Sequence, residues 1–255
     1  MALGLRPLTA RSVIASTLLG TRPPVLPTRL LVAAAGLFGV SDSAARSALS
    51  RMVASGEVEP DGDAAYRLAG SLVDRQQRQE SSRRAELRPW SGDWWLVIIP
   101  AGRRPAAERA RQRSVLARAR LAELREGVWL RPDNLDLGPL DPDLPVGRFR
   151  PERAEPTAAQ LWDLDGWATT ATGLRYRMEQ LTSGLRAGQV ELLAPGFVVS
   201  AAVLRLFQRD PLLPADLLPA TWPGGELRAD YDRFDDAYRS LLRSWFRQQR
   251  DTDDG

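Results

Sequence analysis

The sequence contains no cysteine, no histidine and no lysine. Without cysteine it can form neither disulfides nor thiolate metal sites, and without histidine it lacks the usual metal ligand and general base. Glycine-rich phosphate loops are missing as well, because Gly224 and Gly225 are not followed by the Lys and Ser/Thr of a P-loop and no GxGxxG occurs. We therefore expect no catalytic residue, no metal and no cofactor, and an enzyme is the least favoured class of function.

The N-terminus also lacks the layout of a signal peptide. Arg6 and Arg11 interrupt its apolar residues, and Pro23, Pro24 and Pro27 break the next stretch of chain. By inspection no apolar run reaches membrane-spanning length. The sequence therefore predicts a cytoplasmic protein that does not enter a membrane.

The residues that are present suffice for a sizeable core, since 44% of the 255 residues are hydrophobic, and two or three domains are expected. All basic residues are arginine, and the net charge is only +3. Their distribution is uneven: residues 1–89 hold 12 Arg and 8 acids, whereas residues 152–255 hold 12 Arg and 16 acids. The basic front permits a polyanionic partner, although so modest a surplus is usually a solvated surface.

The first 70 residues predict three helices and a hairpin. The helices are expected at residues 9–20, at residues 28–39 with Thr28 as cap, and from Ser41 or Asp42 to Gly56. The segments EVEP, DGD and AAYRLA then predict strand, turn and strand. This order is typical of a winged helix-turn-helix, whose third helix enters the major groove of DNA, and a helical hairpin on a larger core is the alternative.

The third predicted helix has an apolar and a polar face. Its apolar positions recur at helical period at Ala45, Ala48, Leu49, Met52 and Val53. The opposite face carries Ser43, Arg46, Ser47 and Ser50, with Arg51 on its flank. We expect Arg46 to contact a base edge or a phosphate, and the serines to be smaller donors. At the start of the second helix, Thr28 and Arg29 are candidates to hold a phosphate.

A second unit follows residues 71–89, a polar stretch that predicts a solvated linker or an exposed helix. It is expected to contain a strand at Trp94–Ile99, a long arginine-rich helix at about Ala106–Arg125, strands at VWLRP and VGRFR, and a helix at TAAQLWDLDGW. This β-α-β-β-α order suggests a ferredoxin-like sheet with helices on one side, although no convincing fourth strand is evident.

Helices are predicted near residues 165–186, 196–209 and 226–249, and the prolines of RDPLLPADLLPATWPGG prevent a continuous helix between the last two. The predicted fold class is therefore α+β and multidomain. Its parts are a winged helix-turn-helix at 1–70, a polar linker or helix at 71–89, a ferredoxin-like domain at 90–163 and a helical C-terminal domain at 164–255.

Three further groups of residues are candidate sites. Arg131, after VWL and before Pro132 at the end of a predicted strand, could meet an anionic ligand, but a surface ion pair is the simpler expectation. The neighbouring carboxylates of Asp163 and Asp165, and of Asp235 and Asp236, are expected to be surface charge. The eight tryptophans are expected to pack in cores, with a ligand pocket lined by some of them as the alternative.

Three stretches resemble one family, the PaaX-type transcriptional regulators. They are ARSALSRMVASGEVE in the winged helix, WSGDWWLVII followed by GVWLRPDNL in the central region, and DPLLPADLLPATWPG near the C-terminus. The resemblance spans nearly the whole chain and implies a winged helix, a ferredoxin-like domain similar to the small nuclease of CRISPR adaptation, and a helical C-terminal domain. It also implies a dimeric repressor of a catabolic operon that leaves DNA on binding an effector, such as an acyl-CoA thioester.

The sequence departs from this family at two places. The predicted wing carries Glu59, Asp61 and Asp63 where a DNA-gripping wing commonly has cations, so Arg67 is the one phosphate candidate there. The first central strand ends at Pro100 without the carboxylate of the related nucleases, which disfavours an enzyme. The leading hypothesis is a DNA-binding repressor, and the alternative is a winged-helix scaffold or protein-interaction module without DNA binding.

Overall fold

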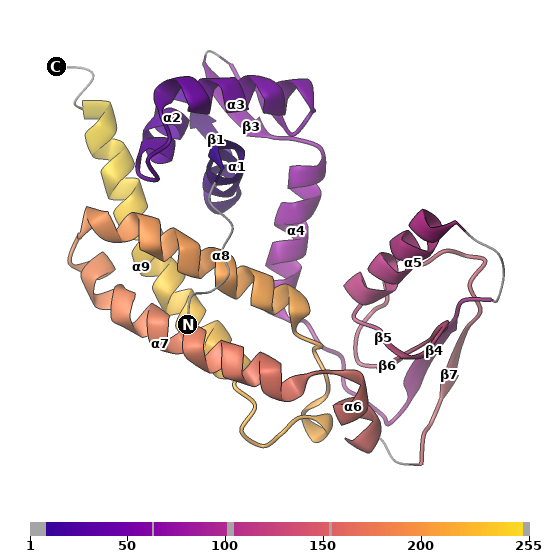
Figure 1. Ribbon diagram of the computed structural model, residues 1–255. Coiled ribbons are helices and arrows are strands. Elements are labelled where there is room, and N and C mark those ends of the chain that lie inside the picture. The colour runs from indigo at the N-terminus through magenta and orange to yellow at the C-terminus, as the bar shows by residue number, and fades with distance from the viewer. Residues whose placement is uncertain (1–8, 63, 101–104, 153–154, 252–255) are drawn as a thin grey trace. The chain divides into compact units, whose positions relative to one another are not determined.

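A computed structural model describes residues 9–62, 64–100, 105–152 and 155–251 (Figure 1). The chain divides into two compact units, each built from separate stretches of sequence. Unit 1 comprises Met1–Glu80, Arg175–Ala202 and Ala229–Gly255, and unit 2 comprises Ser81–Leu174 and Val203–Arg228. The C-terminal helices are thus shared between the units, and the division into four consecutive segments stays a prediction.

Unit 1 begins with three helices and a small sheet, in the order expected for a winged helix-turn-helix. The elements are α1 (Ala10–Gly20), β1 (Val25–Pro27), α2 (Thr28–Gly36), α3 (Asp42–Ala54), β2 (Val58–Pro60) and β3 (Ala65–Leu68). The antiparallel sheet has the order β1-β3-β2, so the wing hairpin is extended by the strand between the first two helices. The core between the helices is apolar, because Ile14, Leu31 and Leu49 are each almost fully buried.

Helix α2 differs from its prediction at both ends. Thr28 does not cap it: the N-cap is Pro27, without a side-chain hydrogen bond, and the Thr28 hydroxyl donates instead to the Ala64 carbonyl at 2.7 Å. The helix also ends at Gly36 rather than at Gly39, which has a φ of +71°. The Thr28 side chain therefore bonds to the wing hairpin instead of to its own helix.

The stretch after the wing is a helix, α4 (Ser71–Arg84). Leu72 and Ser82 are buried, so the favoured prediction of a solvated linker is wrong. The polar composition of this stretch gave no indication that Leu72 and Ser82 would be buried.

Unit 2 contains a four-stranded antiparallel sheet. Its elements are β4 (Trp94–Ile98), α5 (Ala106–Arg118), β5 (Ala122–Arg125), β6 (Val128–Pro132) and β7 (Val146–Phe149). The strand order β5-β6-β4-β7 is that of a ferredoxin-like sheet. The missing fourth strand is β5, which the sequence prediction merges into the preceding helix. Residues 133–145 connect β6 to β7 without a helix.

The two helices next to this sheet lie on opposite faces, so the expectation of helices on one side is wrong. Side chains alternate between faces along a strand. Val97 packs in one apolar cluster with Leu116 of α5, whereas Trp94, three residues earlier, points to the other face and packs with Ala158 of α6 (Glu155–Leu161). The second cluster also contains Leu213 and Leu217 of the proline-rich segment.

The remaining chain is helical, as expected. It forms α7 (Leu164–Arg186), the 3-10 turn η1 (Val190–Leu192), α8 (Leu193–Arg209), the 3-10 turn η2 (Ala215–Leu217) and α9 (Gly224–Asp251). In unit 1, α9 contacts α7 through an Arg175–Asp230 ion pair of 2.6 Å. Asp235 is buried and bonded to Arg239 at 2.8 Å, which corrects the expectation that this carboxylate is surface charge.

One described helical stretch, Val190–Arg209, is long and apolar enough to cross a membrane, with a mean hydropathy of 1.8. The expectation that no run reaches this length is therefore wrong. Length and composition are weak grounds for a membrane span, because core helices of soluble proteins have the same properties. Leu193, Val203 and Phe207 of this stretch are buried.

Candidate nucleic-acid interface

Helix α3 is fixed at both ends by local contacts. Ser41 is its N-cap, and the Ser41 hydroxyl accepts a hydrogen bond from the Ala44 amide at 3.4 Å. After the helix, Gly56 has a φ of +68°, a left-handed conformation that costs glycine little, and the Glu57 amide donates to the Met52 carbonyl. The apolar face of α3 is buried as predicted at Ala45, Ala48, Leu49 and Met52, whereas Val53 is only half-buried.

The opposite face of α3 is exposed. It carries Ser43, Arg46, Ser47, Ser50 and Arg51. Within the part of the chain that the structure describes, the guanidinium groups of Arg46 and Arg51 make no hydrogen bond or ion pair. The Ser50 hydroxyl donates to the Arg46 carbonyl at 3.2 Å, so its hydrogen is already used. Two cations and two hydroxyl groups therefore remain available on one helix face.

The end of α3 is tied to α1 by an ion pair that the sequence did not predict. The Arg11 Nε donates to Glu57 Oε2 at 2.7 Å, and this hydrogen bond lowers the pKa of the Glu57 carboxyl. The pair is partly exposed and so contributes little stability by itself. It nevertheless removes Arg11 and Glu57 from the charge available to a partner.

The start of α2 lies beside the wing. Arg29 is exposed, whereas Thr28 donates both its hydroxyl and its backbone amide to the Ala64 carbonyl. Thr28 therefore has no hydrogen left to donate to a phosphate. Of the two predicted phosphate contacts in α2, the donor role of Thr28 is excluded, and that of the exposed Arg29 stays a prediction.

The charged side chains of the wing hairpin pair with one another. Arg67 on β3 pairs with Glu59 on β2 at 2.7 Å and approaches Asp61 to within 3.9 Å. All three side chains are at least a third exposed. Asp63, which belongs to the same predicted acidic tip, lies outside the described residues. The one predicted phosphate contact of the wing is therefore already paired with carboxylates of its own hairpin.

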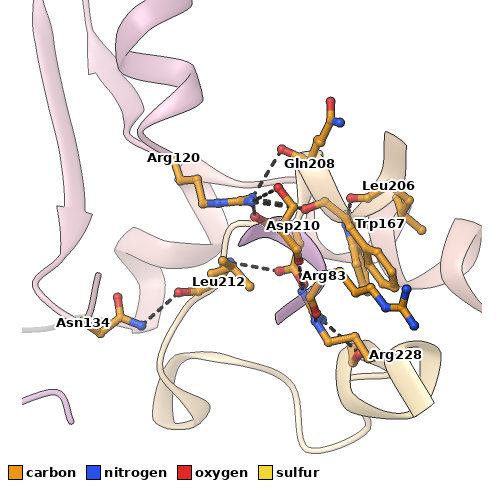
Figure 2. Close-up of polar contacts among 12 residues, drawn as sticks. Arg83, Arg120, Asn134, Trp167, Leu206, Gln208, Asp210, Leu212 and Arg228 are labelled. Carbon is orange, nitrogen blue, oxygen red and sulfur yellow. Dashed lines mark hydrogen bonds and ion pairs between the residues drawn. The ribbon is translucent and has the colours of Figure 1, made fainter. Parts of the chain in front are cut away.

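Unit 2 holds a buried polar cluster that the sequence did not indicate (Figure 2). The Arg228 guanidinium bonds the Asp210 carboxylate at 2.8 Å, donates to the Arg83 carbonyl at 3.2 Å and lies 4.9 Å from the centre of the Phe207 ring. Arg120 donates to the Asp210 carbonyl from a different part of the chain. Asp210 is only 2% exposed, so its partners are structural rather than solvent.

Arg120 and Arg131 complete this cluster. Arg120 donates to the carbonyls of Phe207 and Gln208 in the last turn of α8, where backbone carbonyls lack the next turn of the helix as a donor, and to the Ser82 hydroxyl. Burial lowers the pKa of Arg120, and the nearby Arg228 opposes its charge. Side chains that serve helix ends in this way are not available to a ligand.

The expectation of a surface ion pair at Arg131 is wrong, because Arg131 is fully buried. It donates to Asn134 Oδ1 at 2.9 Å and to the carbonyls of Pro132, Ala119 and Leu212. Burial, together with repulsion from Arg120, lowers the pKa of Arg131 to about 9. Its position near the end of a strand was the only signal in the sequence, and that signal did not reveal burial.

The described residues contain no group of three or more His, Cys, Asp or Glu side chains that could hold a metal ion. Among the tryptophans, Trp94, Trp129, Trp167 and Trp245 are buried, and Trp167 stacks on Trp222 with ring centres 4.4 Å apart. These aromatic side chains fill space within the cores.

The chain matches two family models. Residues 9–72 match the family described as PaaX-like protein, and residues 162–248 match the PaaX-like protein C-terminal domain. A solved structure, that of the uncharacterized protein Rv0674 from Mycobacterium tuberculosis, is similar throughout: the identity is 38%, the TM-score is 0.72, and the match covers 93% of this chain and 98% of that one. None of the curated proteins compared matches significantly. The two family matches and the similarity over nearly the whole length show that the chain belongs to the PaaX family, a family of transcriptional regulators.

Proposed function

We propose that this protein is a sequence-specific DNA-binding regulator, acting in the cytoplasm as a dimeric repressor of a catabolic operon. A small effector, such as an acyl-CoA thioester, would release it from the operator. The observation that carries the proposal is the exposed polar face of α3 within a winged helix-turn-helix. In that fold the third helix is the element that lies in the major groove.

The side chains on this face suit the chemistry of DNA. Arginine donates two parallel hydrogen bonds to the O6 and N7 atoms of guanine, and it also pairs with phosphate. Arg46 lies near the N-terminal half of α3, where base contacts are made, while Ser43, Ser47 and Ser50 flank it and Arg51 follows one turn later. We assign base contact to Arg46 and backbone contact to Ser43, Ser47 and Arg51, whereas Ser50 would first have to release its hydrogen bond to the Arg46 carbonyl.

Contacts outside α3 are secondary in this proposal. Arg29 at the start of α2 is the better candidate for a phosphate contact there, because Thr28 already donates its hydroxyl and amide hydrogens to the Ala64 carbonyl. Arg67 would have to leave Glu59 to reach a phosphate, and the remaining carboxylates of the wing would oppose the approach. Affinity should therefore depend mainly on α3.

Dimerisation and effector release rest on membership of the family. A dimer on a palindromic operator would place its two α3 helices about one turn of DNA apart, or a multiple of that. An acyl-CoA effector would need cations for its phosphates and an apolar slot for its acyl group. Because Arg120, Arg131 and Arg228 are engaged in the buried cluster, we expect the phosphates to be held by other arginines.

DNA binding is tested by fluorescence anisotropy with the DNA upstream of the protein's own coding region. Arg46→Ala should weaken binding by about 1–3 kcal/mol at fixed salt if Arg46 contacts a base. Arg78→Ala is the matched control, since Arg78 is an exposed arginine of α4 in the same unit and its loss changes the net charge equally. Equal affinity of the two variants would remove Arg46 from the interface.

The alternative is a scaffold or protein-interaction module without DNA binding, which the self-paired wing favours. The two functions differ in their response to salt. A DNA-binding protein releases counterions from each phosphate that it neutralises, so its affinity falls steeply with salt. No retarded band with the upstream DNA at low salt would favour the scaffold.

The effector class is tested by thermal shifts. A panel of acyl-CoA thioesters and free aromatic acids is added to the protein alone and to the protein–DNA complex. A ligand that binds the folded protein should raise the Tm, and an effector should also dissociate the complex. Stabilisation by none of the thioesters would count against a CoA ligand.

A further inference from the structure

Helix α3 presents a carboxylate on its exposed surface as well as its arginines. Asp42 is the first residue of α3 after the Ser41 cap, and its side chain is exposed. Within the described part of the chain Asp42 makes no hydrogen bond or ion pair. It stands four residues before Arg46, a spacing and an order at which an acid and a base can pair on a helix, yet the two side chains remain separate.

A carboxylate at this place has a cost for a protein that binds DNA. It repels the phosphate backbone and so lowers the affinity for every sequence alike. A first-turn acid also interacts favourably with the N-terminal end of the helix dipole, and α4 has one in Asp74. The helix dipole therefore explains why an acid at position 42 is favourable for α3. It does not explain why an acid stands on the surface that would face DNA.

Base recognition gives the carboxylate a second role. An ionised carboxylate only accepts hydrogen bonds, and the donors in the major groove are the exocyclic amines of cytosine and adenine. Side-chain carboxylates pair with the N4 amine of cytosine, whereas adenine is read by the amide of Asn or Gln. The edges of guanine and thymine present acceptors, which a carboxylate rejects.

We propose that Asp42 is a specificity-determining residue that selects a cytosine in each operator half-site. This inference rests on the proposed function and deepens it. The helix rises about 6 Å over the four residues from Asp42 to Arg46. Base pairs rise about 3.4 Å each along DNA. The cytosine selected by Asp42 should therefore lie roughly two base-pair steps from the guanine contacted by Arg46.

The test is selection from a DNA library with a randomised half-site, followed by affinity measurements on single-base variants. Wild type should prefer cytosine at one position by about tenfold. Asp42→Asn should lose this preference and favour adenine at the same position, because an amide can both accept from and donate to adenine. A purely structural role for Asp42 would not move a base preference.

Asp74→Asn is the matched control. It removes the same charge from the first turn of another helix, so it should lower the Tm by a similar amount to Asp42→Asn while keeping the preference for cytosine. If Asp42→Asn binds all sequences more tightly with unchanged base preferences, Asp42 is only a repelling charge and the inference is wrong, while the proposed function stands. If wild type binds no DNA, the proposed function itself fails and the inference with it.

Discussion

The arginines of α3 and the arginines of unit 2 are the same residue type in opposite situations. Arg46 and Arg51 are exposed on one helix face, and among the described residues their guanidinium groups have no partner. Arg131 is fully buried, Arg120 and Arg228 are partly buried, and the donors of all three are used by a carboxylate, an amide and backbone carbonyls. In a chain whose every cation is arginine, function therefore depends on which guanidinium groups the fold leaves open.

The buried arginines lose most when the carboxylate of their cluster is removed. Asp210→Ala should lower the free energy of unfolding by about 3–5 kcal/mol, because Arg228 and Arg120 would then be charged and buried without an acid. Urea denaturation followed by tryptophan fluorescence measures the change. Asp216→Ala, an exposed acid of η2, should change it by less than about 0.5 kcal/mol. Equal effects of the two variants would show that the cluster is not a stabilising contact.

A second prediction concerns the charge of Arg131. Because burial lowers its pKa to about 9 in the folded state, the unfolded chain binds this proton more tightly. The cost of the buried charge is thus fully present below about pH 9 and is relieved as the pH rises above that value. Wild type should gain about 1 kcal/mol of stability relative to Arg131→Met between about pH 7 and about pH 10.

This gain is measured as the difference between two denaturation series, so that other titrating groups cancel. Arg111→Met, which removes an exposed arginine of α5, serves as the control and should differ from wild type by the same amount at both pH values. A pH-independent difference for Arg131→Met would mean that Arg131 is solvated like the arginines of α3.

The smallest expected effect is at the wing, an intermediate case in which Arg67 is exposed but paired. Glu59→Gln removes the partner of Arg67, so DNA affinity should rise by about 0.5 kcal/mol with little change in stability. Anisotropy at low salt measures it, and Glu86→Gln gives the same change in net charge in unit 2. An equal gain in both variants would assign the effect to net charge rather than to the wing.

The local parts of the candidate interface could be predicted from the sequence. The period of Ala45, Leu49 and Met52 predicts which face of α3 is buried, and Ser41 and Gly56 mark its ends, because caps and amphipathic periods depend on residues within a turn or two. The same reasoning placed Arg46 on the exposed face. It considered Asp42 only as a possible helix cap. Thr28 was misjudged because its partner, Ala64, lies in the wing.

The end of α5 illustrates why other boundaries were not predicted. Arg120 adopts a left-handed conformation with a φ of +62° and so ends the helical region where neither glycine nor proline stands in the sequence. Its side chain is held by carbonyls nearly ninety residues away in the chain, at the end of α8. Because residues 119–125 have a composition typical of a helix, the sequence prediction extended the helix over strand β5.

The order of the winged-helix elements, the exposed face of α3 and the family were all determined by the sequence alone, because they depend on spacing and on motifs within short stretches. Only the tertiary structure decided which arginines use their hydrogen-bond donors within the protein. Arg131 and Arg228 meet Leu212 and Arg83 across separations of many tens of residues, and burial of a charge depends on everything packed around it. Long-range packing thus distinguishes the arginines that are bound within this protein from those that it leaves exposed.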